Sequence, residues 1–242
     1  MKLLAIDIGN THVTCGIHEK YWIEIIRIPS NLNFWNSFSK IKKHEISNVA
    51  ISSVVPKLSS IYQEAIRNLL KIDPLIINHE NCGMELIVDE PKEVGIDRIC
   101  NTAAVNKLSL PSIIGDIGSA TNYDVVNENG AFIGGAISPG LKTAAKNLFK
   151  KAALLKKTAF IIPPSPIGKN THTNLQSGIM FGAIDVIDGM FKRLETELDL
   201  KKVNKIITGG FGELISPHLK TKHHFFPHLT LDGIRIILEN SI

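Results

Sequence analysis

The sequence contains the order aspartate, isoleucine, glycine twice, as Asp7-Ile8-Gly9-Asn10-Thr11 and as Asp116-Ile117-Gly118-Ser119-Ala120-Thr121. Each copy follows a short apolar run and precedes a second one, at residues 13–17 and 123–126. This pattern predicts a strand, a tight turn and another strand, with a carboxylate at the turn. Glycine lets backbone N–H groups approach a phosphate closely, and a carboxylate can hold a cation or its water shell. Two such turns facing each other would bind a nucleoside triphosphate from both sides.

A third glycine-rich turn lies nearer the C-terminal end. Residues 205–208 have the composition of a strand and run into Gly209-Gly210-Phe211-Gly212, where backbone can lie against a flat ligand. The order of the three elements resembles the superfamily of sugar and acetate kinases, actin and heat-shock chaperones, with its two phosphate motifs and one adenosine motif. The resemblance implies an α/β fold of two ribonuclease-H-like domains. The alternative is three ordinary turns in an unrelated α/β protein.

Length and charge are those of an ordinary globular protein. The chain has 242 residues, of which 44% are apolar and 21% charged, and its net charge is +4. The length allows one large domain or two of about 110–130 residues. The repeated motif favours two, which we place at residues 1–110 and 111–242. The lysines are scattered in short pairs without clustered arginines or an aromatic platform, so we expect no nucleic-acid surface.

The cysteines and histidines predict neither disulfides nor a metal centre. Three cysteines without metal or redox spacing favour a reduced, cytoplasmic protein. Nine histidines are dispersed apart from a small group at residues 223–228, where no carboxylate or cysteine completes a metal set. The N-terminus lacks the apolar core of a signal peptide, and no stretch is apolar over the length of a bilayer. We therefore expect no membrane association.

Hydrophobic periodicity predicts most of the secondary structure. Short alternating or continuous apolar runs indicate strands at 3–8, 13–18, 21–28, 49–53, 74–78, 84–88, 113–116, 122–126, 131–137 and 205–208. Apolar residues at helical spacing indicate helices at 33–43, 59–70, 99–107, 141–156, 175–198 and 230–239.

The segment Gly95-Ile96-Asp97-Arg98 opens one of these helices. An aspartate in this position can accept a proton from a substrate hydroxyl, and an arginine can bind a carboxylate or phosphate through two N–H groups. The same four residues are compatible with an aspartate that caps the helix and forms a local ion pair.

Two further segments carry small residues where backbone could approach a ligand. They are Gly134-Gly135-Ala136-Ile137-Ser138-Pro139-Gly140, and Gly168-Lys169-Asn170-Thr171 with Gln176-Ser177-Gly178. In the second segment Thr171 offers a hydroxyl, and the helix N-terminus favours an anion. Each segment alone is equally compatible with an ordinary turn.

From Asp7 to Gly233 the chain contains, in order, the segments DIGNT, GIDR, DIGSAT, GGAISPG, GKNT with QSG, TGGFG and LTLDG. Taken together, these segments closely resemble the motifs of type III pantothenate kinases. Sugar kinases share only the DxG and GG elements. The resemblance implies ATP-dependent phosphorylation of a primary hydroxyl of pantothenate, which gives 4'-phosphopantothenate in the first step of coenzyme A synthesis. It also implies Mg²⁺ or another divalent cation, and K⁺ or NH₄⁺, as cofactors.

The resemblance assigns roles by position. Its ATP-phosphate loop falls on Asp7, Ile8, Gly9, Asn10, Thr11, His12, Val13 and Thr14. Its pantothenate-binding segment falls on Gly95, Ile96, Asp97 and Arg98, with Asp97 as the catalytic base. Asp116 matches the aspartate that holds the monovalent cation, and Ser119 matches a second ATP contact. Thr171 matches a threonine that reaches the substrate from the neighbouring subunit of a homodimer.

Two positions depart from the family's pattern. Ser119 stands where threonine is usual and keeps the hydroxyl without the methyl group, and Asn122 replaces a threonine before the Tyr123-Asp124 pair. Neither change removes a group that the chemistry requires.

Three other functions are compatible with such a fold. They are phosphorylation of another small hydroxyl substrate, non-enzymatic transcriptional regulation, and a nucleotide switch like actin or the chaperones. Retention of Asp7, Asp97 and Asp116 disfavours the regulator, and the chain is too short for the large subdomains of a switch.

The predicted helix at 175–198 points to an oligomer. Apolar residues occupy much of its surface rather than one stripe, so we expect it to be buried on more than one side. The rest of its own domain could cover it, and so could a two-fold partner. We predict a homodimer with two shared active sites, because a self-complementary C2 dimer is the commonest homo-oligomer.

Overall fold

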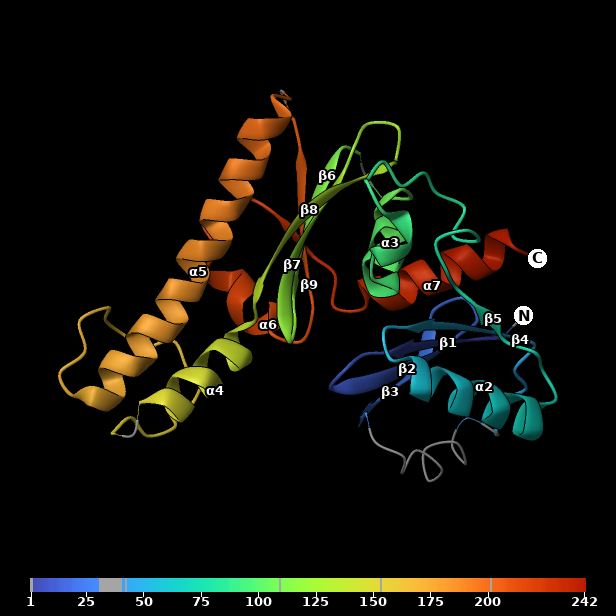
Figure 1. Ribbon diagram of the computed structural model, residues 1–242, viewed down its shortest axis with the longest axis horizontal. Helices are drawn as coiled ribbons and strands as arrows, with labels where there is room; N and C mark the ends of the chain where they lie inside the picture. Colours follow the sequence, from blue (N-terminus) through green and yellow to red (C-terminus); the bar gives the residue numbers. More distant parts are fainter. Residues whose placement is uncertain (1, 31–40, 42, 109, 153, 201) are drawn as a thin grey trace. The chain divides into compact units, whose positions relative to one another are not determined.

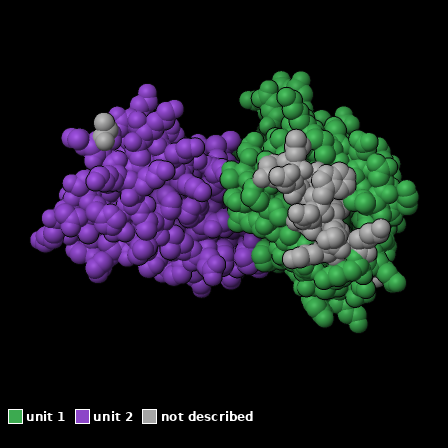
Figure 2. Space-filling model, turned by 90° about the horizontal axis from the view of Figure 1, so that it is seen from below, with its two compact units in different colours: residues 1–110, 129–133, 228–242 green, residues 111–128, 134–227 purple. Residues whose placement is uncertain are grey.

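The computed structural model describes residues 2–30, 41, 43–108, 110–152, 154–200 and 202–242 (Figure 1). The chain divides into two compact units (Figure 2). Unit 1 contains residues 1–110, 129–133 and 228–242, and unit 2 contains residues 111–128 and 134–227. Each unit is built around one five-stranded sheet.

The sheet of unit 1 has the strand order β3-β2-β1-β4-β5. The strands are β1 (Leu3–Ile8), β2 (His12–His18), β3 (Trp22–Pro29), β4 (Asn48–Ser53) and β5 (Leu75–Ile76). β1 pairs antiparallel with β2 and parallel with β4. The alternation along β1 explains its burial on both faces, because Leu4, Ile6 and Ile8 enter one core cluster and Leu3 and Ala5 enter another.

Helices cover both faces of this sheet. One face carries α2 (Pro56–Leu70), whose Leu58, Tyr62, Ala65 and Ile66 join the cluster of Leu4 and Ile6. The other face carries α3 (Ile96–Val105) and α7 (Leu229–Asn240), which pack against each other as well as the sheet. A short 3₁₀ turn, Pro91–Glu93, leads into α3.

The sheet of unit 2 repeats this arrangement, with the order β10-β9-β6-β7-β8. Its strands are β6 (Ser112–Ile117), β7 (Ala120–Val126), β8 (Phe132–Pro139), β9 (Asn204–Thr208) and β10 (His224–Phe225). β6 pairs antiparallel with β7 and parallel with β9, as β1 does with β2 and β4. The duplicated DxG motif is thus part of a duplicated sheet topology, and the predicted α/β fold of two ribonuclease-H-like halves is confirmed.

The helices of unit 2 are α4 (Leu141–Lys151), α5 (Thr171–Leu198), the short α6 (Gly212–Ile215) and the 3₁₀ turn Ser216–His218. Met180, Ile184, Ile187 and Phe191 of α5 form one core cluster with Ile113, Ile117 and Ile207 of the sheet. In the described part of the chain, no helix is both long and apolar enough to span a membrane.

The structure departs from the sequence-based prediction in several places. The strand predicted at 84–88 is wrong, because only Leu86 forms an isolated bridge, to Phe132, between bends on either side. The strand predicted at 74–78 is reduced to β5, and the helix predicted at 141–156 ends at Lys151. The helix predicted at 33–43 lies largely outside the described residues.

The two units do not follow a simple division at residue 110. The first stretch of unit 1 ends there, but residues 129–133 and α7 also belong to unit 1. α7 is the last helix of the described chain, and it packs against α3, β1 and β4 of unit 1.

Candidate active site

The first DxG turn joins β1 to β2 in unit 1. Gly9 N–H donates to the carbonyl of His12 at 3.0 Å, which closes the turn. Ser30, at the end of β3, supports the turn from the side, since its hydroxyl donates to Gly9 O at 2.6 Å and its N–H donates to Thr11 O at 3.0 Å. Asn10 and Thr11 are exposed. The turn is therefore held in one shape while its polar tip stays accessible.

Asp7 lies at the end of β1, directly before this turn. It is in register with Ser52 of the parallel strand β4, whose buried hydroxyl donates to Asp7 Oδ1 at 3.1 Å. Sequence reasoning identified Asp7 but missed Ser52. The signal available for Ser52 was its place at the end of a strand, where a parallel neighbour brings it beside Asp7.

The GIDR segment forms the N-terminus of α3, with Gly95 at the N-cap and Asp97 in the first turn. Asp97 Oδ1 accepts a hydrogen bond from the Arg98 N–H at 2.9 Å. Glycine suits position 95, because a Cβ there would lie 2.6 Å from Asp97 Oδ1. Gly95 occupies the N-cap position, and the Asp97 carboxylate accepts an N–H of the first turn, so a local supporting role of Asp97 is compatible with its proposed role as base.

Burial raises the pKa of Asp97 above its usual range, although the N–H and positive charge of Arg98 act in the opposite direction. Desolvation disfavours the charged carboxylate, so the side chain holds a proton more readily than an exposed aspartate. A carboxylate with a raised pKa is a better acceptor for a hydroxyl proton near neutral pH.

The buried thiol of Cys100 lies within electrostatic range of both Asp7 and Asp97. Burial raises the pKa of Cys100 most, the charge of Asp7 raises it further, a hydrogen bond with Ser52 lowers it, and the charge of Asp97 raises it. The charges of Asp7 and Asp97 therefore both act on the Cys100 thiol. Unit 1 alone brings the first DxG turn and the GIDR segment into one neighbourhood.

The guanidinium of Arg98 lies over an aromatic ring of the same unit. Its guanidinium carbon lies 5.1 Å from the centre of the Phe132 ring, and Phe132 is fully buried. Sequence reasoning missed this contact, because Phe132 lies in a different strand, beyond the second DxG motif.

The second DxG turn and the GG turn lie together in unit 2. Asp116 on β6 is in register with Thr208 on β9, and Gly209 follows directly. Gly209 has φ +90°, and a Cβ there would overlap Asp116 Oδ1 and lie 2.6 Å from the Ile117 nitrogen. Glycine is required both for this backbone conformation and for the close approach. The Asp116 carboxylate thus lies close to a glycine of each turn, Gly118 and Gly209.

The carbonyl of Ser119 is fixed by the first turn of α4. It accepts hydrogen bonds from the Gly140 N–H at 3.2 Å and from the Thr143 hydroxyl at 2.6 Å. A Cβ on Gly140 would lie 2.6 Å from Ser119 O. Any side chain at the end of the GGAISPG segment would therefore clash with this carbonyl oxygen. Ser119 itself is exposed. Thr143 is a second supporting residue that the sequence motifs do not indicate.

Thr171 is the first residue of α5 and is exposed. The preceding Asn170 caps the helix by a capping box with Thr173, which is why α5 begins before the predicted residue 175. Ile179 of α5 lines a groove together with Ile117, the residue after Asp116. Thr171 precedes Ile179 by eight residues, which is about 12 Å along the helix axis. Thr171 therefore belongs to the same unit as Asp116 but lies outside the groove, on the N-terminal side of the α5 residues that line it.

No group of three or more histidine, cysteine, aspartate or glutamate side chains could hold a metal ion, as far as the described residues extend. Asp116 therefore does not belong to a cluster of three or more such side chains among these residues. Such an arrangement fits a cation that keeps other oxygen ligands from water or phosphate, rather than a site built from protein side chains alone.

Each sheet carries a DxG turn at the end of its central strand, and the second sheet also carries a GG turn. This combination of sheets and turns is that of the superfamily of sugar kinases, actin and heat-shock chaperones. Solved structures agree on the fold. One solved under the description Baf family transcriptional activator, from Campylobacter jejuni, has a TM-score of 0.64 at 19% identity, over 98% of both chains. The ROK hexokinase of Thermus thermophilus has a TM-score of 0.54 at 9% identity, over 100% of this chain and 99% of its own.

The chain belongs to the type III pantothenate kinase family, whose profile matches residues 3–193. The type III pantothenate kinase of Moorella thermoacetica is 37% identical over 99% of both chains. That of Finegoldia magna is 38% identical over 97% of this chain and 96% of its own. The resemblance read from the motifs is thereby confirmed.

Proposed function

We propose that this protein transfers the γ-phosphate of ATP to the primary hydroxyl of pantothenate and forms 4'-phosphopantothenate, the first step of coenzyme A biosynthesis. The observation that carries the proposal is the partly buried Asp97, whose pKa is raised by desolvation and which lies beside Arg98 at the start of α3. Membership of the type III pantothenate kinase family supports the choice of substrate.

In this proposal unit 1 binds and activates pantothenate. Asp97 accepts the proton of the attacking hydroxyl, which raises the nucleophilicity of its oxygen at the moment of transfer. Arg98 binds an anionic group of the substrate, and Gly95 and Ile96 let the substrate approach the helix N-terminus closely. Phosphoryl transfer needs little other covalent assistance, so positioning and charge stabilisation supply most of the rate.

We further propose ATP contacts in each unit by itself, on the family's motifs. Residues 7–14 of the first DxG turn would contact the phosphates, and Ser119 of the second turn would contribute a hydroxyl. The glycine turns fit phosphate groups because they present backbone N–H groups without side chains. Asp116 fits K⁺ or NH₄⁺, and Asp7 fits the water shell of Mg²⁺. The cations would neutralise charge on the phosphates.

The two units thus divide the work. We assign the first phosphate turn and the GIDR segment to the N-terminal ribonuclease-H-like domain, and the second phosphate turn and adenosine motif to the C-terminal one. α7 completes the first domain through its packing on α3. We also assign the protein to the cytoplasm, and we infer that it binds neither nucleic acid nor membrane.

A direct assay tests the proposed reaction. The purified protein should consume ATP in the presence of pantothenate, Mg²⁺ and K⁺, and the product should carry one added phosphate by mass spectrometry. Sugars and other small alcohols serve as competing substrates. Consumption of ATP with another alcohol and not with pantothenate would favour the different-substrate kinase, and consumption with neither would favour a non-enzymatic role.

The role of Asp116 leads to a prediction about ions. We expect the rate to rise when K⁺ or NH₄⁺ replaces Na⁺, because the larger ions give up their hydration water more readily to bind beside the phosphates. Asp116→Ala should remove most of this dependence and weaken ATP binding. Steady-state kinetics at constant ionic strength measure both effects. Equal rates for the wild-type protein in sodium and potassium would exclude a specific monovalent site at Asp116.

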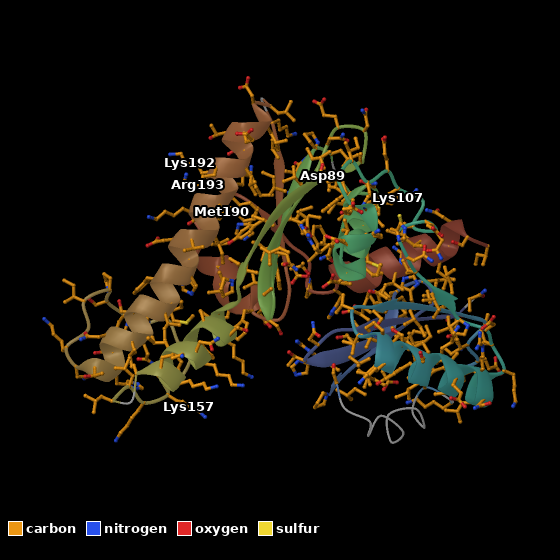
Figure 3. All side chains as sticks on the ribbon, in the orientation of Figure 1. Asp89, Lys107, Lys157, Met190, Lys192 and Arg193 are labelled. Atoms are coloured by element: carbon orange, nitrogen blue, oxygen red, sulfur yellow. The ribbon has the colours of Figure 1, made fainter. Side chains whose placement is uncertain are left out.

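The homodimer is supported by the surface of α5. From Thr171 to Ile184 this 28-residue helix contains no Asp, Glu, Lys or Arg, whereas charged residues such as Lys192 and Arg193 occupy its second half and project from the helix in Figure 3. Gly178 and Gly182 have open space at their Cβ positions, and Val186 is 53% exposed. These residues line a groove of about 300 Å³ between α4 and α5. An uncharged, partly apolar face of this kind suits contact with a second copy.

Shared sites predict complementation between inactive variants. Asp97→Asn would disable the base, and Thr171→Ala would remove the hydroxyl that a subunit lends to its partner's site. In the mixed dimer one site keeps Asp97 from one chain and Thr171 from the other, so about a quarter of all sites should be active after random exchange. Activity after mixing and subunit exchange measures this, with each variant alone as control. Absence of rescue after confirmed exchange, or a fully active monomer in sedimentation, would contradict shared sites.

A further inference from the structure

Phe132 is a core residue that also contacts a charged side chain. Its ring is fully buried among the apolar residues that join α3 and α7 to the sheet of unit 1, yet its face lies 5.1 Å from the guanidinium carbon of Arg98. A planar guanidinium over an aromatic face is attracted by the negative charge density of the ring. The contact therefore favours one orientation of Arg98 out of the many that its long side chain could adopt.

The ring is held in place by the backbone on both sides. The Phe132 N–H donates to Glu85 O at 3.0 Å, and Phe132 O accepts from the Ile87 N–H at 2.8 Å. These two bonds make the bridge between Leu86 and Phe132, which is all that remains of the predicted strand at 84–88. The loop before α3 is thus tied to the residue that supports Arg98.

This contact is compatible with anion binding by Arg98. The attraction to the ring does not require the N–H groups of the guanidinium as hydrogen-bond donors, and those groups are what a carboxylate binds. An arginine oriented in advance also loses less conformational freedom when the substrate binds. Both effects act on the substrate's anionic end rather than on its reacting hydroxyl.

We propose that Phe132 is a positioning residue that orients Arg98 toward the carboxylate of pantothenate, and that it thereby contributes to selection of a carboxylate-bearing substrate. This inference rests on the proposed function. It assigns to the segment before GGAISPG a role that the motifs themselves do not carry.

The test compares Phe132→Leu with the wild-type protein on two substrates. Leucine keeps an apolar side chain in the core but has no aromatic face. We expect the KM for pantothenate to rise about 3- to 30-fold, with kcat and the KM for ATP nearly unchanged. With pantothenyl alcohol, in which the carboxylate is replaced by a hydroxymethyl group, the KM should hardly change, so the preference for pantothenate should fall.

Ile237→Val is the matched control, because Ile237 is buried in the same cluster on α7 and loses one methyl group. It should lower stability without altering the preference for the carboxylate. Arg98→Gln should reduce that preference at least as much as Phe132→Leu, and the double variant should be no worse than Arg98→Gln alone. The Arg98→Gln comparison remains available if Phe132→Leu does not fold.

The outcomes separate the two proposals. A wild-type protein that does not phosphorylate pantothenate would overturn the proposed function. A wild-type protein that does so, combined with an unchanged preference in Phe132→Leu or with additive effects in the double variant, would overturn the role of Phe132. If Arg98→Gln itself leaves the preference unchanged, Arg98 does not read the carboxylate and the inference fails.

Discussion

Replacing Asp97 with asparagine is expected to lower kcat by about 100-fold or more while the protein remains folded and binds ATP. The amide cannot accept the hydroxyl proton, but its oxygen can still accept the Arg98 N–H that Asp97 Oδ1 accepts at 2.9 Å. Steady-state kinetics and a nucleotide-binding measurement check the two halves of this expectation.

The same substitution should make the protein slightly more stable at neutral pH. The pKa of Asp97 is raised in the folded state by burial, so the folded protein binds this proton more tightly than the unfolded chain does. Well below the ordinary pKa of aspartate, Asp97 is protonated in both states and does not affect the free energy of unfolding. As the pH rises from the ordinary pKa through the raised pKa of the folded state, ionisation of Asp97 progressively lowers the free energy of unfolding, and the loss is complete above the raised pKa. The Asp97→Asn variant has no such contribution, so its gain over the wild-type protein should disappear on acidification.

The raised pKa also predicts the pH dependence of the rate. As a base, Asp97 works only when deprotonated, so kcat/KM for pantothenate should fall with decreasing pH at a higher value than an ordinary aspartate would give. In Asp97→Asn this acid limb should be lost from the residual activity.

Asp89→Asn is a suitable control because Asp89 is an exposed acid on the loop before GIDR (Figure 3). It makes the same chemical change with no expected effect on kcat. If Asp97→Asn turned over pantothenate at a rate close to that of this control, Asp97 would not be the base.

The parts of the fold that the sequence predicted well are those determined by local pattern. β1, β2 and β6 alternate or run continuously in apolar residues and are bounded by DxG turns, so their limits differ from the prediction by one residue or less. The predicted strand at 84–88 failed because a short apolar run pairs only where a neighbouring strand is available, and Phe132 offers a single bridge. Sequence spacing holds no information about such a neighbour.

The candidate site divides in the same way. Asp7, Asp97 and Asp116 stand in short motifs and could be identified from the chain alone. Ser52 and Thr143 could not, because each reaches its motif through strand register or helix packing rather than through proximity in sequence. The residues that fix the geometry of this site are thus harder to predict than those that would perform the chemistry.

The LTLDG segment of α7 shows what such a supporting contact does. Its Thr230 hydroxyl donates to Asn101 Oδ1 on α3 at 2.9 Å, and its Asp232 accepts from the Trp22 indole N–H at 3.0 Å. A Cβ on Gly233 would overlap the carbonyl group of Cys100 and lie 2.9 Å from the Cα of that residue. Glycine is therefore what allows α7 to approach the backbone of α3 just behind Asp97 and Arg98.

Gly233→Ala is accordingly expected to destabilise the protein by about 3 kcal/mol, at the upper end of the range for overpacking, because the obstructing atoms are backbone and cannot change rotamer. Relief requires α3 to move, and α3 carries the GIDR segment, so kcat/KM for pantothenate should fall even under conditions where the variant is fully folded. Urea unfolding and kinetics well below the unfolding midpoint separate the two effects. Gly189→Ala on α5, where a Cβ meets nothing within 4 Å, should instead be neutral or stabilising by up to about 1 kcal/mol. A Gly233→Ala protein as stable and as active as this control would show that α3 tolerates the displacement and that the close approach of α7 does not position the active-site residues.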